Sequence, residues 1–147
     1  MKIVLYPAEE ADFEFAFEVK RQALGPYVEA RWGWNDDFQR ELHRKYWNER
    51  PWSIIVFEDQ KVGTVAVTRT DTYLQFDEFY LLPSFQKQGI GTEVLQAVTQ
   101  QADAAGLPIR LQHLKWNPVG ALYKRHGFAL VAENDTHFLL ERAPRRC

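Results

Sequence analysis

The stretch that decides the fold is LQFDEFYLLPSFQKQGIGTEVLQAVTQQADAA, residues 74–105. Its first part alternates side chains as a strand does, and its last part repeats apolar side chains at helical spacing. Between the two lies the loop Gln86-Lys87-Gln88-Gly89-Ile90-Gly91-Thr92. Glycines at the start of a helix let a ligand approach the backbone, and the unpaired N–H groups of the first turn attract anions such as phosphate. The stretch therefore predicts a strand, an anion-binding loop and a helix.

The spacing of the glycines excludes two familiar phosphate-binding loops. A Walker loop needs Lys-Ser or Lys-Thr after the second glycine, and neither pair follows Gly91. A dinucleotide fingerprint needs a third glycine where Val94 stands. A glycine pair before a helix can also be only a tight turn. Here the strand before the pair and the helix after it favour a nucleotide-type site.

Two motifs, in order along the chain, resemble those of the GNAT superfamily of N-acetyltransferases. The first is Leu81-Leu82-Pro83 followed by Gln-x-x-Gly-x-Gly at 86–91, which resembles the acetyl-CoA loop of that family. The second is Asn117-Pro-Val-Gly-Ala-Leu-Tyr123 with Gly127-Phe128 after it, which resembles the family's Asn…Leu-Tyr…Gly-Phe signature. The resemblance covers residues 74–128, and the Trp-Gly-Trp segment at 32–34 is similar to one in a GNAT subfamily.

The resemblance implies a binding site for acetyl-CoA along the central strand, the loop and the next helix. The pantetheine arm would pair with the strand, and the pyrophosphate would lie on the N–H groups of the loop. The residues that the resemblance assigns to acetyl-CoA are Tyr80, Leu81, Leu82, Gln86, Lys87, Gln88, Gly89, Ile90, Gly91, Thr92, Asn117 and Tyr123.

The rest of the chain predicts one α+β domain over residues 1–147, with a basic, disordered tail at 142–147. We expect strands at 2–6, 53–58, 62–70, 74–82, 109–114, 128–133 and 137–140, and helices at 12–24, 36–47, 90–105 and 118–126. Because a helix connects the strands at 74–82 and 109–114, these two should be parallel. This order predicts a GNAT-like mixed, mostly antiparallel sheet with a splayed central parallel pair and helices on both faces.

Composition limits the partners that we expect. A net charge of −2 gives no general attraction to nucleic acid or to an anionic membrane. The single cysteine, Cys147, cannot form an internal disulfide, which favours a reducing, cytoplasmic location. The four histidines are scattered, so we expect no metal site. The edge strand at 2–6 and the final hairpin could pair across a homodimer.

These features predict an enzyme that moves the acetyl group of acetyl-CoA to a primary amine by direct transfer in a ternary complex, since no suitably placed cysteine could carry it. By resemblance, Tyr123 protonates the departing thiolate, and Asn117 contacts pantetheine or caps the helix that follows it. Glu78 is the candidate general base, because it lies on the alternation face of Phe76 and Tyr80. Burial there would raise its pKa.

Other assignments of the base remain open. A bulge could turn Glu78 or Asp77 to solvent, and His113 or His137 could serve instead. Gln112 stands where some family members carry a glutamate.

The segment between the first two helices is expected to form the acceptor site. Tyr27, Trp32 and Trp34, near Glu29, Asp36 and Asp37, could make an aromatic, acidic wall for a cationic amine, and His113 and His137 are further candidates for substrate binding. Alternatively, the tryptophans belong to the core and the nearby Asp36 and Asp37 only complement a helix N-terminus. Two other functions are compatible with the sequence: a non-catalytic acyl-CoA sensor, or a partner-binding module that uses the Trp-rich surface.

Overall fold

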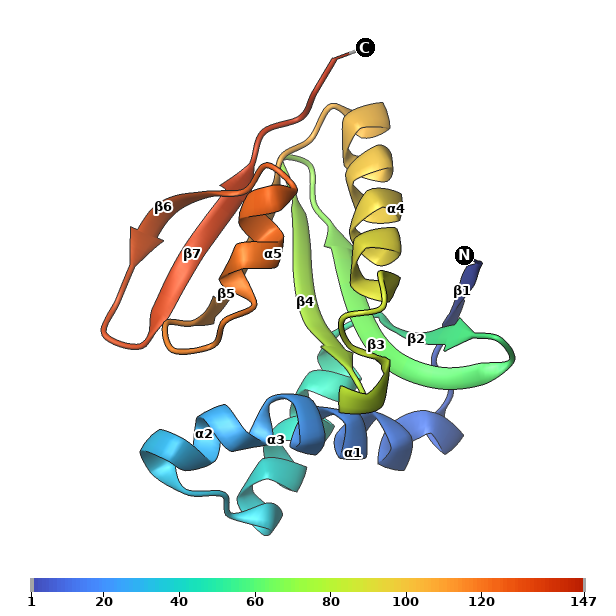
Figure 1. Ribbon diagram of the computed structural model, residues 1–147, viewed down its shortest axis with the longest axis vertical. Helices are drawn as coiled ribbons and strands as arrows, with labels where there is room; N and C mark the ends of the chain where they lie inside the picture. The colour runs from blue at the N-terminus through green and yellow to red at the C-terminus, as the bar shows by residue number, and fades with distance from the viewer. Residues whose placement is uncertain (1, 147) are drawn as a thin grey trace.

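A computed structural model, in which residues 2–146 are described, confirms the expected α+β fold (Figure 1). One mixed sheet has the strand order β1-β2-β3-β4-β5-β7-β6. The strands are β1 (Ile3–Pro7), β2 (Trp52–Phe57), β3 (Gln60–Arg69), β4 (Leu74–Leu81), β5 (Ile109–Leu114), β6 (Ala129–Glu133) and β7 (His137–Arg142). The helices are α1 (Phe13–Ala23), α2 (Gly25–Trp32), α3 (Asp36–Glu49), α4 (Ile90–Ala105) and α5 (Gly120–Arg125), with 3₁₀ turns at Glu10–Asp12 and Pro83–Phe85.

The parallel pair is β4 and β5, as expected, and it holds together only at one end. Leu74 pairs with Ile109 and Gln75 with Arg110, and the remaining residues of the two strands are not paired with each other. The strands therefore diverge toward their C-terminal ends. This divergence leaves the β5-facing side of β4 without backbone partners from residue 76 onward, which is where a ligand can enter the sheet.

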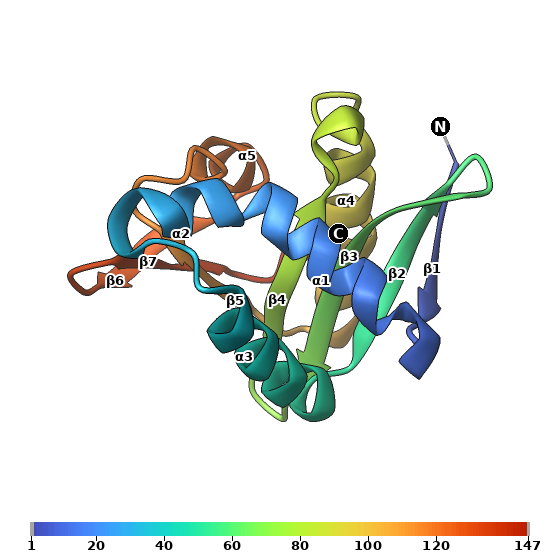
Figure 2. The same ribbon diagram turned by 90° about the horizontal axis from the view of Figure 1, so that it is seen from below.

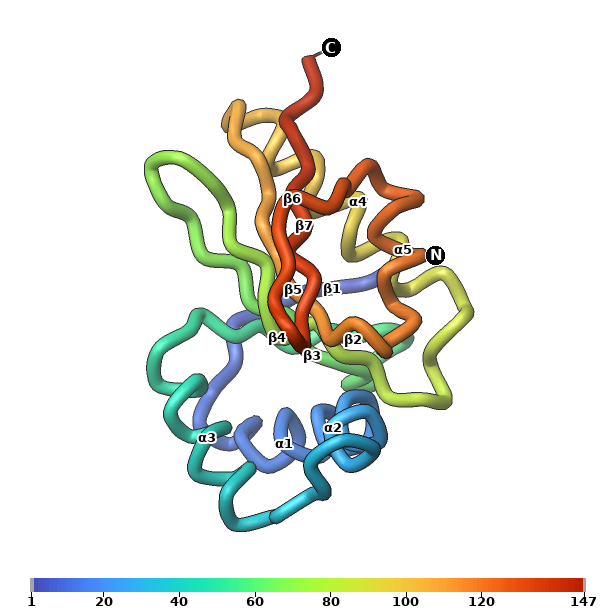
Figure 3. Tube along the Cα trace, turned by 90° about the vertical axis from the view of Figure 1, so that its left-hand side faces the viewer, coloured from blue at the N-terminus to red at the C-terminus, as the bar shows by residue number. Residues whose placement is uncertain are grey.

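Helices lie on both sides of the sheet, and α4 supplies the main core. Figures 1 and 3 show α4 and α5 on one side of β4 and β5, with α3 on the other and α1 crossing below. Viewed from below, α2 continues α1 toward β7 (Figure 2). The side chains of α4 that are buried against the sheet are Ile90, Val94, Leu95, Val98 and Ala102. Gly106, with a φ of 70°, then ends the helix in the left-handed conformation that glycine adopts without strain.

The structure adds one helix that the sequence analysis missed. Gly25-Pro26 ends α1 as expected, but the same pair also begins α2. Proline fits the first turn of a helix because its missing N–H would have no partner there. The segment 25–32, expected as a loop, is thus a short helix. α3 begins as expected, since the Asn35 side chain accepts a hydrogen bond from the Phe38 N–H at 2.9 Å.

A bulge in β4 corrects the alternation expected around Glu78. The register with β3 shifts here, and Glu78 has a φ of 54°. After the bulge, Phe79 shares the α4 side with Phe76, their ring centroids 5.3 Å apart. Glu78 and Tyr80 instead face α1, where the Lys20 ammonium lies 3.1 Å from a Glu78 oxygen and 6.0 Å from the Tyr80 ring centroid. The bulge is present, yet it buries Glu78 and does not turn it to solvent.

The end of the chain is more ordered at Arg142 than the sequence suggests. Arg142 is the last residue of β7, and its guanidinium donates to both oxygens of Asp103 at 2.9 and 3.1 Å. The backbone N–H of Arg145 donates to the same carboxylate at 2.8 Å. Asp103, near the end of α4, thus supplies the partner that keeps Arg142 in the sheet. Cys147 lies outside the described residues.

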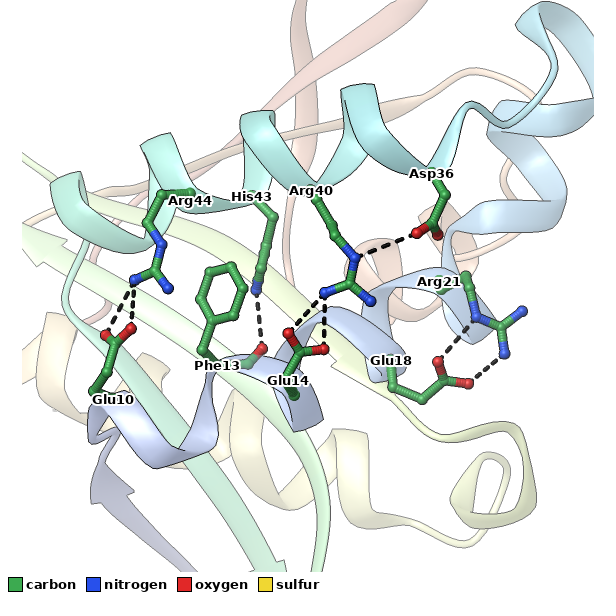
Figure 4. Close-up of polar contacts among 9 residues, drawn as sticks. All are labelled: Glu10, Phe13, Glu14, Glu18, Arg21, Asp36, Arg40, His43 and Arg44. Atoms are coloured by element: carbon green, nitrogen blue, oxygen red, sulfur yellow. Dashed lines mark hydrogen bonds and ion pairs between the residues drawn. The ribbon is translucent and has the colours of Figure 1, made fainter.

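The α1–α3 interface combines exposed ion pairs with a buried aromatic cluster (Figure 4). Arg40 and Arg44 of α3 reach Glu14 and Glu10, each at 2.7 Å. Such exposed pairs stabilise little, because solvent screens them. Between them His43 is completely buried, with its Nε2 3.3 Å from the Phe13 carbonyl oxygen and its Nδ1 without a partner in the described structure.

We expect His43 to make the protein sensitive to mild acid. Burial, followed by the charge of Lys20, lowers the pKa of His43 from 6.5 to about 4. Unfolding exposes the ring, which then binds a proton below its ordinary pKa, so stability is full above about pH 6.5 and falls as the pH drops toward 4. Between about pH 7.5 and pH 5 the free energy of unfolding should fall by about 2 kcal/mol.

Urea titrations at several pH values would measure this slope. The matched variant is His43→Leu, which cannot titrate at this position. Its free energy of unfolding should vary less across the same pH window, by the same 2 kcal/mol or so. An equally steep slope in His43→Leu would assign the acid sensitivity to other groups.

Candidate active site

A cavity of about 980 Å³ occupies the gap between the diverging strands and extends beneath α1–α3. It brings together most of the residues that the sequence pointed to. Those that line it are Tyr27, Trp32, Glu78, Tyr80, Leu81, Gln86, Lys87, Gly89, Gly91, Thr92, His113, Asn117, Tyr123 and His137. The expected site residues that do not line it are Leu82, Gln88, Ile90 and Trp34.

One end of the cavity is the glycine loop at the start of α4. Gly89 precedes the helix with a φ of 87°, and Lys87 has a φ of 61°. In the described structure no side chain caps α4, and the first backbone bond of the helix runs from Glu93 N–H to the Gly89 carbonyl. The N–H groups of residues 90–92 are therefore available to an anion.

The side chains of the loop hold its shape. Gln86 donates to the Leu81 carbonyl at 2.9 Å, and Gln88 donates to the Ser84 carbonyl at 2.7 Å. Ile90 is fully buried, so it anchors the loop in the core and offers a ligand only its backbone. A Cβ on Gly91 would lie 3.4 Å from Leu122 and 3.5 Å from Phe79, which is ordinary van der Waals contact, so packing against these two side chains does not by itself require glycine here.

Tyr123 of α5 lines the cavity. Its ring is buried, 6.2 Å from the ring of Phe76 and 5.7 Å from that of Phe128. Burial raises the pKa of Tyr123 above its usual value. The hydroxyl therefore stays protonated at neutral pH and can donate a proton or a hydrogen bond. Asn117 accepts a hydrogen bond from the Val119 N–H at 3.1 Å, as a residue that caps the turn before α5 does.

The two carboxylates at the β4 bulge differ in their surroundings. Glu78 has one oxygen 3.1 Å from the Lys20 ammonium and the other 2.5 Å from Nη1 of Arg50. Asp77 accepts a hydrogen bond from Gln75 on Oδ1 at 3.2 Å, whereas its Oδ2 is 3.9 Å from Nε of Arg50. Burial raises the pKa of Asp77, and Arg50 opposes the shift. The contacts of the Asp77 carboxylate are thus longer than those of the Glu78 carboxylate.

Lys20 and Arg50 line the cavity as well, and the sequence analysis did not identify them. Lys20 is buried, and its ammonium lies 5.4 Å from the ring of Tyr46 and 5.7 Å from that of Trp52. Its position in the sequence could have indicated that it is buried, because Lys20 follows Phe17 by three residues and therefore lies on the apolar face of α1. A cation there needs a buried anion as a partner.

The part of the cavity beneath α1–α3, where the sequence predicts the acceptor site, contains some of the expected aromatic residues. Tyr27 and Trp32 of α2 line it, whereas Trp34 packs 6.1 Å from the ring of Phe17 and donates to Asp36 at 3.3 Å. Trp34 therefore stabilises the helix junction. Side chains of α3 line the cavity as well: Phe38, Gln39, Leu42 and Tyr46.

The two candidate histidines, His113 and His137, also line the cavity. His113 Nδ1 is 2.8 Å from the Leu114 carbonyl, and a Cβ on Gly120 would lie 3.0 Å from its Nε2. His137 Nδ1 is 2.7 Å from the Thr136 hydroxyl. Burial and the neighbouring His113 lower the pKa of His137. Both rings are thus held by local contacts at the edge of the cavity.

Two further structural findings concern residues 2–146. None of the helices there is long and apolar enough to cross a membrane. Within the same range, no group of three or more His, Cys, Asp or Glu side chains is arranged to hold a metal ion.

Comparisons with known proteins agree with this geometry. Solved structures with a similar fold include the PaiA N-acetyltransferase of Thermoplasma acidophilum in complex with coenzyme A, with a TM-score of 0.78, 18% identity and coverage of 97% of this chain and 99% of that one. The ribosomal-protein-S18-alanine N-acetyltransferase of Escherichia coli has a TM-score of 0.72, 13% identity and coverage of 99% and 96%. A GNAT acetyltransferase of Elizabethkingia anophelis with acetyl-CoA bound has a TM-score of 0.69, 16% identity and coverage of 96% and 97%.

These likenesses show the fold. A comparison with curated proteins finds no match. The family model described as an acetyltransferase (GNAT) domain matches residues 49–130, which is more than half of the chain and includes the glycine loop and Tyr123. The protein therefore belongs to the GNAT acetyltransferase family.

Proposed function

We propose that this protein is an acetyl-CoA-dependent N-acetyltransferase that moves the acetyl group to a primary amine by direct transfer in a ternary complex. The observation that carries the proposal is one cavity that is lined both by the glycine loop at the uncapped N-terminus of α4 and by the buried Tyr123. Three structural neighbours of the same fold are acetyltransferases, and two of them hold coenzyme A or acetyl-CoA.

The residues present fit acetyl-CoA. The N–H groups of residues 90–92, with Lys87 beside them, would hold the pyrophosphate. The β4 backbone at Tyr80 and Leu81, which β5 leaves free, would pair with the amides of the pantetheine arm as an added strand does. The thioester would then lie in the gap between the strands, near Tyr123. Bound there, acetyl-CoA supplies an activated acetyl group.

Two groups of this chain would move the protons. The Tyr123 hydroxyl donates its proton to the sulfur as the C–S bond breaks. The proton of the acceptor ammonium must leave before nitrogen can attack the carbonyl carbon. Asp77 is better placed than Glu78 to accept it, because Lys20 and Arg50 already occupy both oxygens of Glu78. In this proposal Glu78 has an indirect role, because it holds the cations of Lys20 and Arg50 near Asp77.

Acetyl-CoA binding by the Gly89→Glu variant tests whether the glycine loop at the start of α4 binds the pyrophosphate. A side chain at Gly89 strains a left-handed residue, and a carboxylate there repels the pyrophosphate. We expect the Kd for acetyl-CoA, measured by calorimetry, to rise at least about tenfold. The matched control is Gly106→Glu, which carries the same change at a left-handed glycine at the other end of α4, with no atom within 4 Å of its Cβ.

The possible results distinguish an acetyltransferase from a non-catalytic acyl-CoA sensor. Equal weakening by both variants, or no binding by the unaltered protein, would contradict the proposed site. Acetyl-CoA binding with no amine-dependent release of coenzyme A would instead indicate an acyl-CoA sensor. The cytoplasmic location and the homodimer expected from the sequence stay predictions.

A further inference from the structure

The acceptor end of the cavity is mainly apolar. Its side chains from α1, α2 and α3 include Leu24, Tyr27, Val28, Trp32, Phe38, Leu42 and Tyr46. Two of these, Trp32 and Phe38, are 55% and 59% exposed, which is unusual for large aromatic side chains that line a cavity. Exposed apolar surface of this kind commonly marks the place where a ligand covers it.

The aromatic wall is held in place before any ligand arrives. The Trp32 and Trp116 rings pack 5.5 Å apart, and the Trp116 Nε1 donates to the Tyr27 carbonyl at 2.8 Å. These contacts tie α2 to the loop between β5 and α5. Phe38 lies in the first turn of α3, which Asn35 caps. A ligand that enters here meets a preformed surface, which reduces the entropy lost on binding.

Most of the carboxylate oxygens that line the cavity already contact other side chains of the protein. Glu78 and Asp77 are the carboxylates among the described residues that line the cavity. Glu78 holds Lys20 and Arg50, and Asp77 Oδ1 is bonded to Gln75, which leaves Asp77 Oδ2 as the oxygen with the loosest contact. Among the carboxylate oxygens of the cavity, Asp77 Oδ2 is therefore the one best able to accept the ammonium of an acceptor.

The Tyr46 ring near Asp77 is not available to a second ammonium group of the acceptor. The Tyr46 ring already has the Arg50 guanidinium 4.0 Å and the Lys20 ammonium 5.4 Å from its centroid. A second ammonium on the acceptor would lie near these two cations, or against Leu24, Val28 and Leu42. Both positions are unfavourable, since the first repels charge and the second removes it from water.

We propose that the acceptor is a primary amine with a single positive charge carried on an apolar or aromatic body, its nitrogen beside Asp77 and its body between Trp32 and Phe38. This inference rests on the proposed acetyltransferase function and names its substrate class. It disfavours polyamines.

A pair of amines of equal length tests the charge argument. Hexylamine and 1,6-diaminohexane differ by one terminal amino group, and 2-phenylethylamine adds an aromatic body. With the full chain and saturating acetyl-CoA, amine-dependent thiol release should give hexylamine a kcat/KM at least tenfold above that of the diamine. We expect 2-phenylethylamine to react at least as well as hexylamine.

Two substitutions test whether Trp32 and Phe38 contact the body of the acceptor. Trp32→Ala and Phe38→Ala should each raise the KM for 2-phenylethylamine by about tenfold and leave kcat within about threefold, because they remove apolar contacts far from the reacting atoms. Val131→Ala is the control, since Val131 of β6 is 59% exposed and lies outside this cavity. It should change neither constant.

The inference fails separately from the proposed function. It is overturned if the diamine or spermidine is preferred, if the wall variants leave KM unchanged, or if acetyl-CoA binds and none of these amines reacts. Turnover of spermidine would still support an acetyltransferase. Absence of acetyl-CoA binding would overturn the proposed function itself.

Discussion

Glu78→Gln should lower the free energy of unfolding by about 3–5 kcal/mol, although it removes a single charge. The Glu78 side chain is 2% exposed and is the partner of both Lys20 and Arg50. The Lys20 side chain is only 7% exposed, so it cannot exchange this partner for water. Without Glu78, two cations face each other across a neutral amide.

A double variant provides the control. Lys20→Met with Glu78→Met replaces the ion pair by apolar side chains of similar size, and buried pairs exchanged in this way often cost little or even stabilise. Arg50 keeps Asp77 nearby and is 28% exposed, so water can reach it. We expect the double variant to recover most of the loss in urea-induced unfolding. A Glu78→Gln protein within about 1 kcal/mol of the unaltered one would show that the cluster is not coupled as the distances indicate.

This expectation affects how activity data on Glu78 should be interpreted. Loss of turnover in Glu78→Gln would follow from the displaced cations even if Glu78 never accepts a proton. Asp77→Asn gives the cleaner comparison, because Asp77 shares only looser contacts with Gln75 and Arg50. If Asp77 is the proton acceptor, its replacement lowers kcat while the protein stays folded.

The sequence predicted the parts of the structure that depend on local pattern. The strand, glycine loop and helix at 74–105 are present because alternation, left-handed glycine and helical spacing are each encoded within a few residues. The parallel pair followed from a single helical crossover, and its divergence matches the resemblance to the family. Asn35 capped its helix as expected.

The errors arose where distant segments determine the local structure. The alternation in β4 placed Glu78 on the face of Phe76, but the pairing with β3 introduces a bulge, and Lys20 of α1 supplies the charge that keeps the carboxylate buried. Nothing within residues 74–82 encodes either partner. Arg142 is a similar case, because its place in β7 depends on Asp103 of α4. Charged residues on apolar stripes, as at Lys20, are the signal that could have indicated such pairs.

Tyr123→Phe should lower kcat by about 10²- to 10⁴-fold, which is the usual contribution of a positioned general acid. The substitution removes only the hydroxyl. The contacts of the ring with Phe76 and Phe128 persist, so we expect the melting temperature and the Kd for acetyl-CoA to change little. A large loss of kcat in a stable variant that still binds acetyl-CoA would assign the loss to the chemical step.

The pH dependence gives this prediction a second readout. Because burial raises the pKa of Tyr123 above its usual value near 10, the hydroxyl remains protonated throughout the neutral and mildly alkaline range. The unaltered enzyme should therefore show no decline of kcat from this group below about pH 10. In Tyr123→Phe the thiolate must take its proton from water, so the remaining kcat should be far lower at every pH. A variant within threefold of the unaltered kcat would show that Tyr123 only packs against the sheet, and that coenzyme A leaves as the thiolate or is protonated from solvent.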